Sequence, residues 1–305
     1  MKKIIIDCDP GFDDSIALML AYGSRAFDIR LITTCAGNQT LEKISKNALK
    51  VLEHLGIDDK VYMGAEKPLM KALEVAEDVH GESGLKSDIL VSDTKKSPEK
   101  NGILKMYQEI MSSDENVTII ATGPLTNVAL LVSSFPDVLA RIECITLMGG
   151  GIHKGNVTKY AEFNIYTDPE AAYIVYNCGA KINMLGLDVT HKALINGDVI
   201  DRIRKIETKG SKLFIDIYNN NKEFYEKHTN LPGVPVHDAC AVAFEIDRGL
   251  FEVEELNVDI EVKDLERIAM TKLVDMEKAQ TVSVSMDIDF EKFVNYLCEA
   301  LENLN

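Results

Sequence analysis

Four aspartates stand close together near the start of the chain, in the stretch Asp7-Cys8-Asp9-Pro10-Gly11-Phe12-Asp13-Asp14. Carboxylates crowded at one place repel one another and raise each other's pKa unless a cation lies among them. Carboxylate oxygens select hard cations, so the cluster favours Ca²⁺ or Mg²⁺ over zinc. A helix cap is the simpler alternative, because aspartate is common at helix N-termini, but capping accounts for Asp13 or Asp14 and not for all four.

The residues on either side of this cluster indicate how it is held. Ile4-Ile5-Ile6 is typical of a buried strand, and the apolar residues from Ile16 to Ala21 follow a helical pattern. The Pro10-Gly11 pair between them predicts a tight turn. The sequence therefore predicts that the carboxylates stand at the end of a strand and in the first turn of a helix.

Apolar strands and amphipathic helices alternate along most of the chain, which predicts an α/β fold with a doubly wound, mostly parallel sheet covered on both faces. Polar residues follow the predicted strands 28–35, 117–121, 142–148 and 181–187, and we expect a ligand site there, beyond the carboxyl ends of the strands. A charged helical segment near 197–246 is expected over this site. We see neither a repeat nor a clear linker, so one domain over residues 1–305 is the expectation.

Several other polar residues carry weak signals when they are taken alone. Asp238 after His237 could be a metal ligand, but a capping aspartate beside a surface histidine fits the pattern equally well. Thr122-Gly123 could present a carbonyl ligand or form a plain strand-to-helix turn. Glu162-Phe163-Asn164 could bind hydroxyl groups. His80 lies in a long segment of little periodicity, 64–100, which is typical of a functional loop or of exposed chain.

Composition excludes several classes of partner. The 305-residue chain has 33 basic and 49 acidic residues and a net charge of −16, which disfavours binding to nucleic acid or to an anionic membrane. Its six cysteines have no metal-site or redox spacing, which favours a reducing, cytoplasmic compartment. The apolar run after Met1-Lys2-Lys3 is too short for a signal peptide.

Six blocks in order along the chain resemble the inosine-uridine nucleoside hydrolases. The first is the aspartate stretch 7–14. The others are Ala36-Gly37-Asn38, Thr122-Gly123-Pro124-Leu125-Thr126-Asn127, Met148-Gly149-Gly150, Glu162-Phe163-Asn164 with Asp168-Pro169-Glu170-Ala171-Ala172, and Val236-His237-Asp238. One block could match by chance, whereas six in the family's order could not.

The resemblance implies a Ca²⁺-dependent enzyme that hydrolyses the N-glycosidic bond of ribonucleosides of the inosine, uridine or cytidine type. It implies that Asp9, Asp14, Asp238 and the carbonyl of Thr122 hold calcium, with Asp7 as support. Asp9 would take a proton from a metal-bound water, and His237 would assist departure of the base. The residues implied to contact the substrate are Asp13, Asn38, His80, Met148, Asn156, Glu162 and Asn164. It also implies a homodimer or homotetramer.

Two other functions remain open. Haloacid dehalogenase phosphotransferases also carry Asp-x-Asp after a strand, but they need Thr or Val where this chain has Gly11. A calcium- or nucleoside-binding protein without catalysis is the other alternative. Two positions depart from the hydrolase pattern, since Ala239 replaces a common proline and Ala269 a usual glycine. The base preference is not readable, although Phe224, Tyr225 and His228 are expected near the base.

Overall fold

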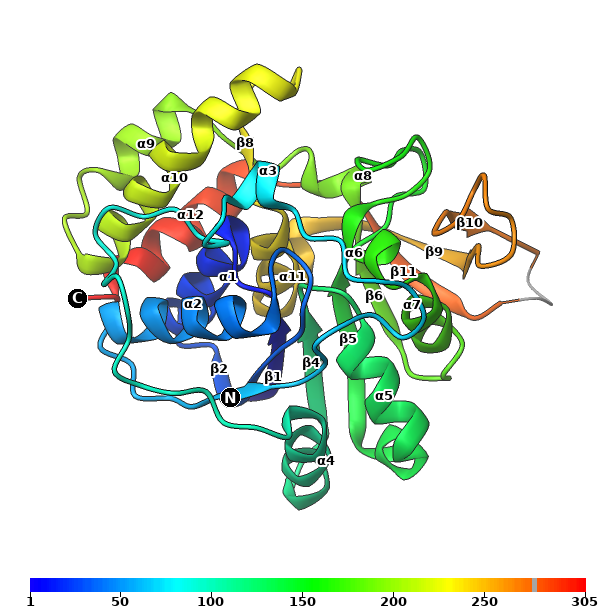
Figure 1. The fold of residues 1–305 in the computed structure, drawn as a ribbon. Coiled ribbons are helices and arrows are strands. Elements are labelled where there is room, and N and C mark those ends of the chain that lie inside the picture. Colours follow the sequence, from blue (N-terminus) through cyan, green and yellow to red (C-terminus); the bar gives the residue numbers. More distant parts are fainter. Residues whose placement is uncertain (276–278) are drawn as a thin grey trace.

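The computed structural model describes residues 1–275 and 279–305, except for the side chains of Asp78 and His80. Its centre is a nine-stranded sheet of order β10-β9-β11-β6-β5-β4-β1-β2-β3 (Figure 1). The strands are β1 (Lys2–Cys8), β2 (Phe27–Thr34), β3 (Val61–Met63), β4 (Val117–Ala121), β5 (Ile142–Met148), β6 (Ile182–Leu185), β9 (Phe251–Ile260), β10 (Thr271–Leu273) and β11 (Thr281–Ile288), with β7 (Leu194–Ile195) and β8 (Val234–Pro235) forming a separate pair. Pairing is parallel from β3 to β11, whereas β9 is antiparallel to both β11 and β10. The expected mostly parallel sheet is confirmed.

Helices cover both faces of the sheet, as predicted (Figure 1). The longer helices are α1 (Phe12–Ser24), α2 (Leu41–His54), α4 (Gly102–Ser112), α5 (Thr126–Ser134), α7 (Pro169–Tyr176), α9 (Gly197–Ile203), α10 (Lys209–His228), α11 (His237–Ile246) and α12 (Phe290–Glu302). The shorter ones are α3 (Glu77–His80), α6 (Phe163–Thr167), α8 (Leu187–Thr190), η1 (Pro136–Arg141) and η2 (Arg248–Leu250). No helix in the described part of the chain is long and apolar enough to cross a membrane.

The alternation of side chains along β1 produces two cores. Ile4 and Ile6 lie in one core with α1, α2 and α10 to α12, whereas Ile5 lies in the other with α4, α5 and α7. Because both faces of the strand are buried, its sequence is continuously apolar rather than alternating. The two layers leave the carboxyl ends of the strands as the place where loops can gather.

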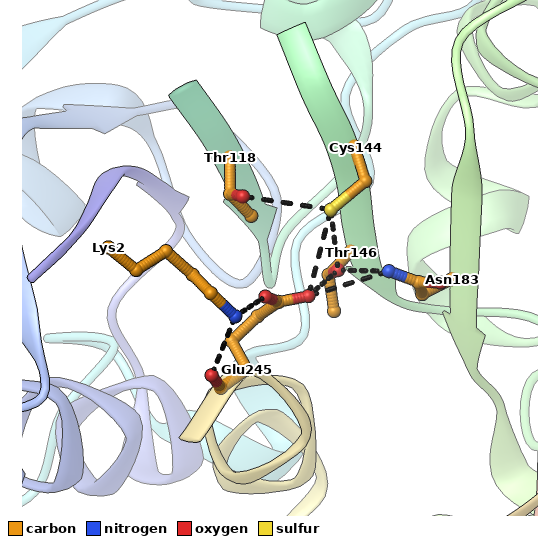
Figure 2. A network of polar contacts seen from close by, with 6 residues as sticks. All are labelled: Lys2, Thr118, Cys144, Thr146, Asn183 and Glu245. Carbon is orange, nitrogen blue, oxygen red and sulfur yellow. Dashed lines mark hydrogen bonds and ion pairs between the residues drawn. The ribbon is translucent and has the colours of Figure 1, made fainter. Parts of the chain in front are cut away.

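A polar network around Glu245 connects the C-terminal end of α11 to the sheet (Figure 2). The carboxylate of Glu245, in the last turns of α11, accepts a hydrogen bond from the hydroxyl of Thr146 on β5, and from Nδ2 of Asn183 on β6 at 3.4 Å. Lys2 of β1 donates to Glu245 Oε2 at 2.6 Å and to the Glu245 backbone carbonyl at 2.8 Å. Three strands therefore hold the end of the helix that begins at His237.

Replacing Glu245 by alanine is expected to lower the free energy of unfolding by about 2 kcal/mol, because the buried hydroxyl of Thr146 would lose its acceptor, while Asn183 Nδ2 would still donate to Thr146 Oγ1 at 2.8 Å. Equilibrium urea unfolding would measure this loss. Glu252→Ala on β9 is the matched control, since Glu252 is exposed and its loss should change stability by less than about 0.5 kcal/mol. Equal losses in the two variants would show that the network adds little.

Candidate active site

A cavity of about 540 Å³ opens at the carboxyl ends of the central strands. Its size lies within the usual range for small-molecule sites, about 300–1,000 Å³. Polar side chains from the segments after β1, β2, β4, β5 and β8 line it, together with aromatic residues of α10. The polar residues include Asp13, Asn38, Thr122, Glu162, Asn164 and Asp238, which come from five of the six sequence blocks. The structure thus brings together residues that lie far apart in the sequence.

Asp9 does not itself line the cavity but is buried against Asn38, which does, and the loop after β2 holds it in place. The backbone N–H of Asn38 donates to Asp9 Oδ2 at 2.7 Å, and Asn38 Nδ2 donates to the Asp9 carbonyl at 3.0 Å. Gly37 and Gly123 permit this close approach. A Cβ at Gly37 would fall 2.2 Å from Asp9 Oδ2, and a Cβ at Gly123 would fall 2.7 Å from Asp9 Oδ1. Oδ1 is buried and has no hydrogen-bond donor among the described residues. One carboxylate oxygen is therefore fixed and the other is available to a ligand.

Asp14 is the hub of the acidic cluster. Its carboxylate accepts hydrogen bonds from the hydroxyl of Thr122 at 2.8 Å, the backbone N–H of Asp9 at 3.1 Å and that of Gly11 at 3.3 Å. Oxygens of Asp13, Asp14 and Asp238 lie within 4.8 Å of one another, close enough for one ion. This group contains two of the expected ligands, Asp14 and Asp238. The group also contains Asp13, which was expected to contact the sugar. It does not contain the expected ligand Asp9, whose backbone N–H donates a hydrogen bond to the carboxylate of Asp14.

Electrostatics in this cluster oppose ionisation of the carboxylates. Burial, and then repulsion from Asp14, raises the pKa of Asp9 well above its ordinary value and that of Asp13 to about 7. Burial likewise raises the pKa of Asp238, with Asp13 and Asp14 adding to the shift, and raises that of Asp14. Burial raises the pKa of Asp7 to about 6, although hydrogen bonds from Thr33 and Asn127 act in the opposite direction. Such a set of buried oxygen ligands fits a hard divalent cation, which would favour the ionised forms.

Four of the residues expected at the sugar lie at the end of β5 or in the segment that follows it. Glu162 accepts hydrogen bonds from the backbone N–H groups of Gly150 and Asn164 at 2.9 and 3.0 Å, which caps α6 and ties it to the turn after β5. Asn164 Nδ2 donates to the carbonyls of Thr122 at 2.7 Å and Met148 at 3.1 Å. All four residues expected here from this region line the cavity, namely Met148, Asn156, Glu162 and Asn164, with Asn156 exposed.

His237 and the aromatic end of α10 form another part of the wall. Phe224, Tyr225 and His228 line the cavity, as expected, and Phe224 stacks on His228 with ring centroids 4.5 Å apart. Burial raises the pKa of Tyr225 above its ordinary value. The side chain of His80 lies outside the described residues. The cavity therefore joins a carboxylate cluster to an aromatic and imidazole surface.

Sequence reasoning did not single out Thr190 and His191. Asp188, the polar residue that follows the predicted strand 181–187, does lie at this strand end, where it accepts hydrogen bonds from the backbone N–H groups of Ile152 and His153 at 2.6 and 3.2 Å. It thereby holds the segment after β5. His191 lines the cavity, and its pKa is lowered to about 4 by burial and by Lys154. Their only sequence signal was the polar run directly after β6.

Comparison with known proteins identifies the family of the chain. The sequence profile of the family described as "Inosine-uridine preferring nucleoside hydrolase" matches residues 4–295. The chain is 36% identical to the inosine-uridine preferring nucleoside hydrolase of Crithidia fasciculata, over 99% of this chain and 98% of that one. It is 40% identical to the pyrimidine-specific ribonucleoside hydrolase RihA of Escherichia coli O1:K1 / APEC, over 98% of each.

A solved structure supports the same family assignment. The purine-preferring ribonucleoside hydrolase from Gardnerella vaginalis superposes with a TM-score of 0.93 at 30% identity, covering 99% of both chains. The match therefore extends over the whole sheet and the loops that carry the site. The chain belongs to the inosine-uridine preferring nucleoside hydrolase family and is a ribonucleoside hydrolase.

Proposed function

We propose that the protein hydrolyses the N-glycosidic bond of ribonucleosides of the inosine, uridine and cytidine type to ribose and free base, and that the reaction depends on Ca²⁺. The observation that carries this proposal is a single cavity with buried carboxylates in one part and His237 with aromatic side chains in another. A nucleoside has matching parts, because its ribose hydroxyls suit the polar region and its base suits the aromatic one.

Asp9, Asp14, Asp238 and the carbonyl of Thr122 would hold the calcium ion. Buried oxygen ligands, raised carboxylate pKa values and the absence of any lysine or arginine among the described cavity-lining residues support this assignment. Asp13 belongs to the same cluster and lines the cavity, which suits a carboxylate shared between ion and sugar. When bound, the ion would lower the pKa of a water molecule and help to orient the ribose.

Asp9 would act as the general base. Its Oδ2 is fixed by Asn38, and its Oδ1 is free among the described residues to accept the proton of the attacking water. Asp13, Asn38, Glu162 and Asn164 would bind the ribose hydroxyls, while Met148 and Asn156 would line the same region. When ionised, the carboxylates of Asp13 and Glu162 would also favour the positive charge that develops on the ribose as the bond to the base breaks.

The choice of base is not inherited from the relatives, because their names describe one as inosine-uridine preferring, one as pyrimidine-specific and one as purine-preferring. One assay tests the proposal against its rivals. The protein is incubated with inosine, uridine, cytidine and a phosphate ester, with and without a chelator, and free ribose and phosphate are measured. Ribose release that the chelator stops supports the proposal; phosphate release would indicate a phosphotransferase, and neither product a binding protein.

His237→Ala should slow hydrolysis of inosine by about 10²-fold, since His237 would protonate the leaving base. Hydrolysis of 4-nitrophenyl riboside should change much less, because its leaving group needs no proton. Steady-state kcat values on the two substrates would measure this difference. Equal losses on both would remove the acid role from His237.

We further propose a single hydrolase domain, a homodimer or homotetramer, and a cytoplasmic location. The continuous sheet supports the first, and six cysteines without disulfides support a reducing compartment. Size-exclusion chromatography with light scattering would test the oligomeric state.

A further inference from the structure

Thr190 contacts His237 from a different element of the fold. The two residues are 47 positions apart in the sequence, and Thr190 Oγ1 lies 2.7 Å from His237 Nδ1. Both side chains are buried, with exposed fractions of 0% and 9%. Thr190 ends α8 and His237 begins α11, so the hydrogen bond joins the helix after β6 to the helix that carries the proposed acid.

Two further contacts hold the same segments together. The rings of His191 and His237 pack at a centroid distance of 5.5 Å with their planes tilted by 51°. The backbone N–H of Val236 donates to the carbonyl of Ala193 at 3.2 Å. The segment 190–193 therefore contacts residues 236 and 237 through a hydroxyl, a ring and the backbone.

Thr190 itself has little freedom to move. Its backbone N–H donates to the carbonyl of Gly186 at 3.0 Å, and the N–H of Leu187 donates to the carbonyl of Gly150 at 2.8 Å. These bonds fix α8 against the turn after β5, and His191, directly after α8, lines the cavity. The hydroxyl therefore presents a fixed partner to Nδ1 of the imidazole.

We propose that Thr190 is a positioning residue for base departure, holding the imidazole of His237 in the orientation that directs Nε2 toward the nucleobase. This inference rests on the proposed function. A hydroxyl can accept from Nδ1–H or donate to Nδ1, so the contact persists in either form of the ring. As the bond between C1′ and the base nitrogen breaks, its electron pair goes to the base, which takes the proton from Nε2. Nδ1–H then stays hydrogen-bonded to Thr190.

Thr190→Val and Thr190→Ser test this role, because valine keeps the shape without the hydroxyl and serine keeps the hydroxyl. Thr190→Val should lower kcat on inosine about tenfold, the effect of one hydrogen bond, and leave kcat on 4-nitrophenyl riboside close to wild type. Thr190→Ser should restore most of the activity on inosine. In a His237→Ala background, Thr190→Val should cause no further loss, because the group it orients is gone.

Several results would overturn the inference. Unchanged inosine hydrolysis by Thr190→Val would do so, as would equal losses on both substrates or an additive loss in the His237→Ala background. Thr190→Ala is a second variant should valine disturb folding, and it should show the same substrate pattern. A wild-type protein without ribose release would overturn the proposed function and the inference with it, whereas an active wild type with unaffected Thr190 variants would overturn the inference alone.

Discussion

Asp9→Asn is expected to lower kcat for inosine by about 10³-fold, the loss typical of removing a general base. The amide has the size of the carboxylate, and its oxygen can still accept the 2.7 Å hydrogen bond from the backbone of Asn38. The group at the Oδ1 position, however, can no longer take a proton. Because Gly37 and Gly123 pack directly against this side chain, a larger substitution would disturb the loops, and its effect on kcat could not be assigned to the lost base. Initial rates of ribose release would measure the change.

Two controls make this experiment decisive. Asp58→Asn removes a carboxylate that pairs with Lys96 at the surface, and it should leave kcat unchanged. Titration with calcium separates the two roles proposed for Asp9, since a loss that excess calcium fully restores would assign Asp9 to metal binding alone. Near-normal turnover of Asp9→Asn without added calcium would exclude Asp9 as the base.

The elements around the aspartate cluster were predictable because local and tertiary signals agree there. Ile4, Ile5 and Ile6 form a strand buried on both faces, and the turn at Pro10-Gly11 leads directly into α1. Agreement between local preference and global packing is what makes such a segment readable from sequence. The same holds for the polar residues after strands, since parallel strands bring their carboxyl ends to one edge.

Elements fixed by distant contacts were not predictable. The apolar run 181–187 suggested a strand to Leu187, but β6 ends at Leu185, because Leu187 starts α8, whose first N–H binds the carbonyl of Gly150. The sequence pattern predicts a strand near 257–262, whereas β9 begins at Phe251, because pairing with β11 extends it. The hydrogen bond between Thr190 and His237 depends on α8 and therefore has no local signature.

One departure from the family pattern, Ala269, lies at a backbone position whose conformation favours glycine. Ala269, at a position where the family usually has glycine, has a φ of +64°, in the left-handed region that favours glycine. Its N–H donates to the carbonyl of Glu261 at 2.8 Å, which keeps the turn in place. The residue lies away from the carboxylate cluster, so the departure concerns the backbone and leaves the proposed chemistry intact.

Removing the metal with a chelator is expected to abolish ribose release and to lower the melting temperature, and added Ca²⁺ should restore both. Without a cation, burial opposes ionisation of the carboxylates of Asp9, Asp13, Asp14 and Asp238, and repulsion from Asp13 and Asp14 adds to the effect on Asp9 and Asp238. An ion that binds only the folded state adds about 2.7 kcal/mol to the free energy of unfolding at one hundred times its dissociation constant. Adding Mg²⁺ instead of Ca²⁺ at the same concentration, and comparing the recovery of ribose release and melting temperature, would show whether the site selects calcium. Full activity in chelator would exclude the metal.

The same charges predict how stability without metal depends on pH. In the folded state the pKa of Asp13 is raised from 3.8 to about 7 and that of Asp7 to about 6, so the folded protein binds more protons than the unfolded chain over this range. Stability must therefore fall as the pH rises from about 4 to about 7. Calcium would keep these carboxylates ionised in the folded state and remove that fall. Melting temperatures at about pH 5 and about pH 8, with chelator and with calcium, would measure the difference, and parallel curves would contradict a cation bound among these aspartates.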